Sequence, residues 1–94
     1  MDGVQHIVVK QTGPEIFEVS VGGRSPTTHR VTAPESYVRS LTGGHAQAAD
    51  LIHKSFEFLL EREPNTSILR MFELSVIQQY FPEYEQFVAA TFRE

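Results

Sequence analysis

Two histidines and a glutamate have a spacing that could bind a metal ion. His53 and Glu57 are four residues apart, which places them on one face of a helix, and His45 lies about two helical turns before His53. Imidazole nitrogens and carboxylate oxygens are ligands for zinc. The same residue types are also common on solvated helix faces. A metal-dependent enzyme is therefore the least favoured of three hypotheses, and we assign no metal ligand, catalytic residue or cofactor.

Other sequence patterns that are typical of enzymes are missing. The glycine pairs Gly22-Gly23 and Gly43-Gly44 fit no dinucleotide-binding or phosphate-binding fingerprint, and no serine lies in a nucleophile elbow. The chain has no cysteine, which excludes a thiolate nucleophile and a disulfide bond. His6 and His29 fall in strand patterns, where we expect packed or half-exposed imidazoles. The sequence therefore favours a protein without catalytic activity.

The segment from residue 80 to residue 87 is rich in aromatic side chains around one proline. Aromatic residues at helix corners usually close a core, so a helix break with two aromatic side chains packed inward explains the segment without a partner. If the four cannot all fit under one small sheet, the remaining ones would contact a partner. The predicted partner surface consists of Tyr80, Phe81, Tyr84 and Phe87. The favoured function is accordingly a non-catalytic protein-interaction module that forms a homodimer and binds through a sheet edge or a helical surface.

A polar strand pattern at residues 28–32 is followed by a short helix, a glycine turn and a long helix. This order resembles that of ribbon-helix-helix DNA-binding proteins, in which strands of two subunits pair and their polar side chains enter the major groove. The resemblance implies that Thr28, Arg30 and Thr32 contact DNA and that the chain is a regulator or an antitoxin-type protein. The net charge of −4 disfavours phosphate binding, so DNA binding is the alternative function.

Three segments in the first third of the chain have strand patterns: the first is rich in β-branched residues, and the other two alternate between polar and apolar residues. They are residues 4–10, 15–21 and 27–32. The connections of about five residues suit hairpins and are too short for the crossovers that parallel strands need. The sequence therefore predicts a three-stranded antiparallel meander.

Helical patterns begin after the third strand. The capping-box pattern from Thr32 to Glu35 predicts the start of a short helix, and Gly43-Gly44 supplies a left-handed end. Residues 46–63 have apolar side chains over a broad arc of helical spacing. An arc this broad predicts a long helix that contacts neighbours on more than one side.

The last third of the chain also has helical spacing. Residues 67–81 could form one helix or two, and we favour two, because Ser75 to Gln78 is a second possible capping box. A final helix is expected at residues 83–92, opened by Pro82. The complete prediction is one α+β domain over residues 1–94, with three to five helices packed on one face of the meander.

The location of the protein is inferred from segments that the sequence lacks. The first residues, Met1-Asp2-Gly3-Val4, have no basic region of a signal peptide. The apolar runs fall far below the roughly 20 residues of a membrane span. We therefore expect a cytoplasmic protein with a protein partner and no membrane contact.

The C-terminal half carries a second resemblance. The residues from Ser55 to Pro64, then Ser67-Ile68-Leu69, then Tyr80 to Tyr84, are similar to a group of short bacterial proteins to which no function is assigned. The resemblance implies a bacterial cytosolic protein and transfers neither an activity nor a site residue.

Overall fold

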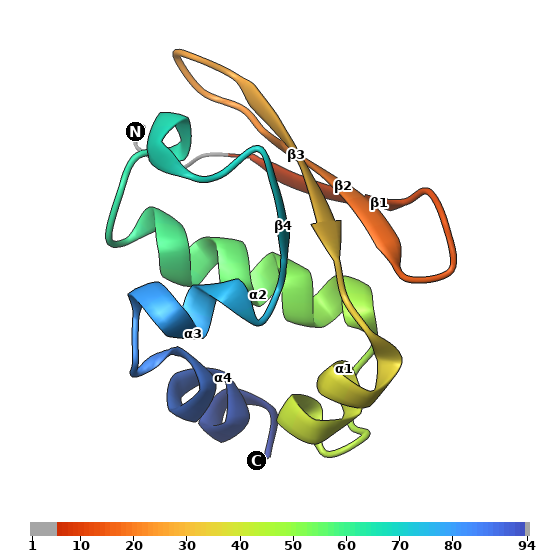
Figure 1. The fold of residues 1–94 in the computed structure, drawn as a ribbon. Coiled ribbons are helices and arrows are strands. Elements are labelled where there is room, and N and C mark those ends of the chain that lie inside the picture. The colour runs from red at the N-terminus through yellow and green to blue at the C-terminus, as the bar shows by residue number, and fades with distance from the viewer. Residues whose placement is uncertain (1–5, 94) are drawn as a thin grey trace.

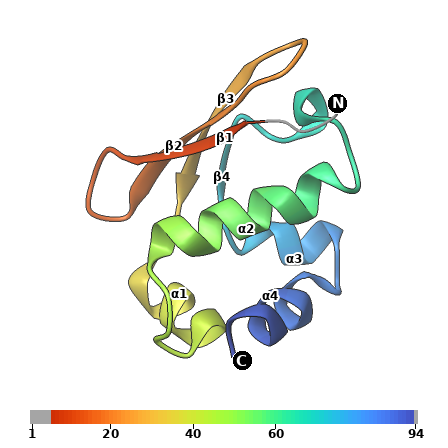
Figure 2. The ribbon, with the colours of Figure 1, turned by 180° about the vertical axis from the view of Figure 1, so that it is seen from behind.

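Four strands and four α-helices make up the part of the chain described by the computed structural model, residues 6–93 (Figure 1). In chain order the elements are β1 (Ile7–Gln11), β2 (Ile16–Val21), β3 (Thr27–Thr32), α1 (Glu35–Thr42), α2 (Ala48–Leu60), the short 3-10 helix η1 (Asn65–Ser67), β4 (Met71–Glu73), α3 (Val76–Tyr80) and α4 (Tyr84–Phe92). Figure 2 shows α2 beneath one face of the sheet, with α1 and α4 beyond it. None of the helices in the described part of the chain covers the opposite face of the sheet, which we call the open face.

The antiparallel meander predicted from the sequence is confirmed. β1 pairs with β2 and β2 pairs with β3, with Val9, Val19 and His29 side by side in register. Along β2 the residues are alternately exposed and buried, as expected for a strand with one covered face. Of the predicted first strand, residues 4 and 5 lie outside the described residues.

The prediction of helix from residue 67 onward is wrong for its first half, where β4 forms instead. β4 lies parallel to β3, with Phe72 opposite Val31. The Arg30 N–H donates to the Arg70 carbonyl at 2.8 Å, and the Leu74 N–H donates to the Thr32 carbonyl at 2.9 Å. The apolar residues of this segment would suit a helix or a strand. The segment forms a strand because it pairs with β3, which lies some 40 positions earlier. The sheet is therefore mixed, with the order β1-β2-β3-β4.

Neither predicted capping box forms at its helix. At the start of α1 the Glu35 N–H donates to the Glu15 carboxylate at 3.0 Å, because Thr32 remains in β3. At α3 the Ser75 hydroxyl donates to the Glu73 carboxylate and caps no backbone N–H. The left-handed end of α1 is confirmed, since Gly43 has φ 66° and its N–H donates to the Arg39 carbonyl.

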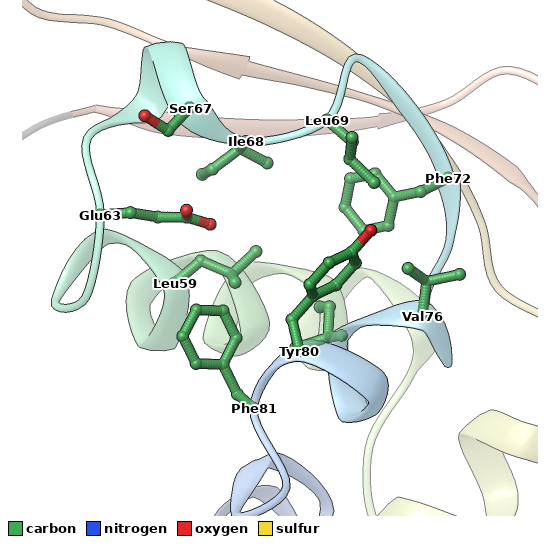
Figure 3. A pocket seen from close by; sticks show the side chains of 10 residues that line it. Leu59, Glu63, Ser67, Ile68, Leu69, Phe72, Val76, Tyr80 and Phe81 are labelled. Atoms are coloured by element: carbon green, nitrogen blue, oxygen red, sulfur yellow. The ribbon is translucent and has the colours of Figure 1, made fainter.

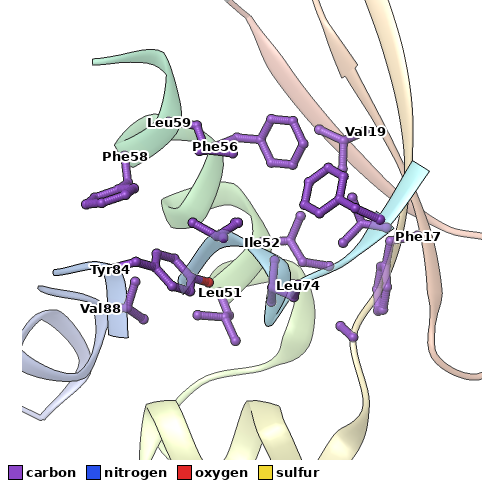
Figure 4. Packing of buried hydrophobic residues seen from close by; sticks show 14 of the residues in the cluster. Phe17, Val19, Leu51, Ile52, Phe56, Phe58, Leu59, Leu74, Tyr84 and Val88 are labelled. Carbon is purple, nitrogen blue, oxygen red and sulfur yellow. The ribbon is translucent and has the colours of Figure 1, made fainter. Parts of the chain in front are cut away.

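Helix α2 contributes side chains to both sides of the core (Figure 4). Phe56 faces the sheet, where its ring centroid lies 5.4 Å from that of His29 and 6.1 Å from that of Phe72. Phe58 faces the other way and packs edge-on against Tyr84 of α4 at 5.4 Å. The broad apolar arc predicted for this helix is thus covered by the sheet on one side and by the C-terminal helices on the other.

The hydroxyl of Tyr84 fixes α4 to α2. Ser55 donates its hydroxyl hydrogen to the Leu51 carbonyl at 2.7 Å, so the 2.7 Å contact between Ser55 and Tyr84 has Tyr84 as its donor. Burial raises the pKa of the Tyr84 hydroxyl. On the same helix, Glu85 accepts a hydrogen bond of 2.8 Å from the Tyr37 hydroxyl of α1. These two bonds orient the C-terminal helix relative to the rest of the core.

Replacement of Phe56 by alanine tests the central position of α2. We expect Phe56→Ala to lower the free energy of unfolding by about 3–5 kcal/mol, because it leaves a cavity between sheet and helix. Urea denaturation followed by circular dichroism measures the change. The control is Met71→Ala, whose side chain is 68% exposed on the open sheet face and should change stability by less than about 0.5 kcal/mol. Equal losses in the two variants would contradict this description of the core.

Candidate functional site

An apolar groove opens between the C-terminal end of α2, the loop after η1, β4 and α3 (Figure 3). It has a volume of about 170 Å³. Its floor belongs to the hydrophobic core, because Leu59, Ile68, Phe72 and Ile77 are buried. We call it the β4–α3 groove, and its lining consists of Leu59, Glu63, Ser67, Ile68, Leu69, Phe72, Val76, Ile77, Tyr80 and Phe81.

Two exposed apolar side chains flank the mouth of this groove. Leu69 is 47% exposed and Tyr80 is 66% exposed. Figure 3 shows the Tyr80 ring reaching from α3 toward Leu69 on the opposite wall. Exposed apolar surface that continues into a buried apolar floor is typical of an interaction site.

A single carboxylate projects into the apolar lining. Glu63 follows the end of α2, and its carboxyl group points into the groove (Figure 3). Partial burial raises the pKa of this carboxyl group. Within residues 6–93 no basic nitrogen lies within 4.0 Å of it, because the neighbouring Arg62 pairs with Glu83 at 3.2 Å and stacks on Phe58 at 3.6 Å. The groove therefore combines apolar surface with a carboxylate that has no ion-pair partner among the described residues.

A buried chain of hydrogen bonds holds one wall of the groove to the sheet. The Asn65 amide donates to the Thr27 hydroxyl at 2.9 Å. The two nitrogens of the His29 ring lie 2.8 Å from that hydroxyl and 2.7 Å from the Leu69 carbonyl. His29 is fully buried, and the network links η1, β3 and the groove.

The protonation state of His29 follows from these partners. The Leu69 carbonyl can only accept, so Nδ1 carries the ring hydrogen, and neutral Nε2 accepts from Thr27. Burial lowers the pKa of His29, the hydrogen bond to Leu69 opposes that effect, and the nearby Arg70 adds to it. A second ring proton would compete with the bond that Thr27 donates. The neutral ring is therefore the form that fits this structure.

The aromatic residues predicted as a partner surface do not form one surface. Tyr84 is fully buried and is not available to a partner. Phe81 and Phe87 pack against Phe58, with ring centroids at 5.9 Å and 5.2 Å, and Phe87 is still 39% exposed. Tyr80 points into solvent beside the groove, and Phe81 contributes to the groove lining. Two of the four residues therefore adjoin the groove.

The residues of the DNA-binding hypothesis lie together on the open face of the sheet. Thr28 and Arg30 are exposed and Thr32 is partly exposed. The strand that carries them has β2 on one side and β4 on the other, so its second half has no free edge for a strand of another subunit. Glu18 lies directly beside Arg30 in the register. DNA contact through Thr28, Arg30 and Thr32 stays a prediction from the sequence.

The residues of the metal hypothesis do not form a site. His53 Nδ1 lies 3.5 Å from the Glu57 carboxylate, which also pairs with Lys54 at 2.9 Å on the surface of α2. Across residues 6–93 no three His, Cys, Asp or Glu side chains are grouped closely enough to hold a metal ion.

Sequence reasoning missed Glu63 and Leu69 as site residues. The helical interpretation of residues 67–81 assigned Leu69 and Phe72 to a helix and so gave no reason to place either residue beside a groove. In the structure Met71 and Glu73 are exposed while Phe72 and Leu74 are buried, but the residue types do not show this alternation, because Met71 is itself apolar. Glu63 had no signal of its own, because its place in the groove depends on how α2, β4 and α3 pack together.

No family model, curated protein or solved structure matches this chain. None of the helices in the described part of the chain is long and apolar enough to cross a membrane.

The buried His29 predicts a stability that depends on pH. Because its pKa is lower in the folded chain than the ordinary 6.5, the unfolded chain binds more protons below that pH. The free energy of unfolding should therefore fall as the pH decreases from 7 toward 5, by at most about 1.4 kcal/mol per pH unit from this group. His29→Gln should remove this part of the decrease, as measured by urea denaturation at several pH values. Parallel pH profiles for the two proteins would contradict the assignment.

Proposed function

We propose that this protein is a non-catalytic interaction module that binds a segment of another protein in the β4–α3 groove. One observation carries the proposal: an exposed apolar rim formed by Leu69 and Tyr80 leads to a buried apolar floor next to the carboxylate of Glu63. Binding would remove this apolar surface from water, at a gain of about 25 cal/mol per Å². The groove therefore supplies both a driving force and a polar group for orientation.

The size of the groove favours a protein partner over a free metabolite. Pockets for drug-sized molecules usually measure roughly 300–1,000 Å³. An apolar cavity of about 150 Å³ accommodates a molecule of the size of benzene. The groove, at about 170 Å³, matches one aromatic or branched aliphatic side chain. A single side chain buried in such a pocket is the usual anchor of a protein interface.

Self-association is a second part of the proposal, and it concerns another surface. Val8, Ile16 and Met71 are exposed on the open face of the sheet, with exposed fractions of 57%, 37% and 68%. A second copy that covered this face would bury all three. The groove lies on the helical side of the sheet, so a dimer of this kind leaves it accessible.

Peptide selection tests binding in the groove. A phage library of random peptides is panned on the full chain, and the recovered peptides are titrated against variants. We expect Leu69→Asp to weaken binding at least about tenfold, because it places a charge at the apolar rim. The matched control Val8→Asp places the same charge on an exposed apolar residue of the open sheet face, at the opposite edge of the sheet from β4, and should leave affinity unchanged. Recovery of no peptide, or of peptides that bind Leu69→Asp as well as the original chain, would contradict the proposed function.

The oligomeric state tests the proposed homodimer. Sedimentation velocity should give a mass of two 10.7 kDa chains at high protein concentration. Val8→Asp should shift the protein toward the monomer, since it adds a charge to the apolar contact. Leu69→Asp, which changes the groove, should leave the dimer intact. A monomer at every concentration would refute the homodimer and would not affect the groove.

A further inference from the structure

We propose that the partner segment binds as an extended strand on the free edge of β4 and carries a lysine or arginine that pairs with Glu63. This inference rests on the proposed function, and it specifies the conformation and the charge of the partner. It follows from three features that meet at one place: an unpaired strand edge, an apolar recess beside it, and a partly buried carboxylate.

The free edge of β4 can be assigned from its hydrogen bonds to β3. The Arg70 carbonyl and the Leu74 N–H both bond to β3. In a parallel ladder the backbone groups of alternate residues face the same neighbour, so those of Phe72 also face β3. The N–H and C=O groups of Met71 and Glu73 therefore point to the other side, where the described sheet has no further strand. These groups can accept and donate hydrogen bonds to an added strand.

The β4–α3 groove lies beside that edge. Phe72 belongs to β4 and lines the groove, so the groove is on the face of the sheet to which Phe72 points. A strand added about 4.8 Å from β4 would direct every second side chain to this same face. One of those side chains would enter the recess over Ile68 and Leu59. In strand addition of this kind, backbone hydrogen bonds to β4 set the register of the partner strand, and the pocket selects which side chain the partner carries.

The charge of Glu63 selects the partner. An apolar segment laid across the groove would remove more water from a carboxylate that is already partly buried, and an isolated buried charge is costly. A lysine or arginine on the segment would offset that cost, whereas an acidic residue would add repulsion. β1 has the other free edge of the described sheet, but the groove and Glu63 adjoin β4 alone.

The test uses synthetic versions of the peptides recovered by panning. We expect the peptides that depend on Leu69 to share a lysine or arginine, and replacement of that residue by glutamate should weaken binding at least about tenfold. Glu63→Gln should remove most of this preference. Glu61→Gln is the matched control, because the Glu61 side chain is 72% exposed two positions away and pairs only at the surface. A second experiment methylates the backbone nitrogens of the peptide one at a time. Methylation at every second position should weaken binding by about tenfold, because it removes a hydrogen bond between the peptide and β4.

Two results separate this inference from the proposed function. Peptides that require Leu69 but are indifferent to Glu63→Gln, or to N-methylation at every position, would overturn the inference and leave the interaction module intact. Failure to recover any peptide that requires Leu69 would overturn both.

Discussion

The structure depends on one constraint: α2 must be covered on two sides at once. Phe56 on one side and Phe58 on the other are both buried, and neither the small sheet nor the C-terminal helices alone could cover them. The sheet needs the same helix, because the apolar face of this thin layer of strands has no other cover between residues 6 and 93. The C-terminal helices are in turn fixed by the hydroxyl of Tyr84, which bonds to Ser55 of α2, and by the ion pair between Arg62 and Glu83. Loss of the central helix would therefore remove the partner of every other layer.

The groove is a consequence of how β4 joins this arrangement. Its three residues extend the sheet only at the second half of β3, and α3 begins shortly after them. The short strand leaves a gap between its outer edge and the end of α2, and the core side chain of Phe72 forms part of the wall. The loop before β4 is fixed by His29, whose ring reaches from β3 to the Leu69 carbonyl. A buried neutral histidine thus supports the surface that is proposed to bind a partner.

Sequence reasoning predicted the local elements well and their long-range partners poorly. The meander could be predicted because strand alternation and turn residues lie within short segments, and the long helix because its apolar arc repeats over several turns. β4 could not be separated from a helix, since its identity depends on pairing with Val31, far away in the chain. The burial of Tyr84, one of the four residues of the predicted aromatic surface, could not be predicted for a related reason. Tyr84 is buried because Phe58 and Ser55 happen to lie opposite it, and a pattern of residue types does not contain that information.

The long separation between β3 and β4 also bears on the order in which the chain folds. The two hairpins of the meander close loops of a few residues, and such contacts form quickly. β4 can pair only after the chain has passed through α1 and α2, so its docking carries the larger entropic cost of closing a long loop. We therefore expect β4 to join late and to detach first when the native state opens locally. A folding intermediate that lacks β4 would have the meander and α2 but no β4–α3 groove, so the proposed recognition would be restricted to chains that have completed folding.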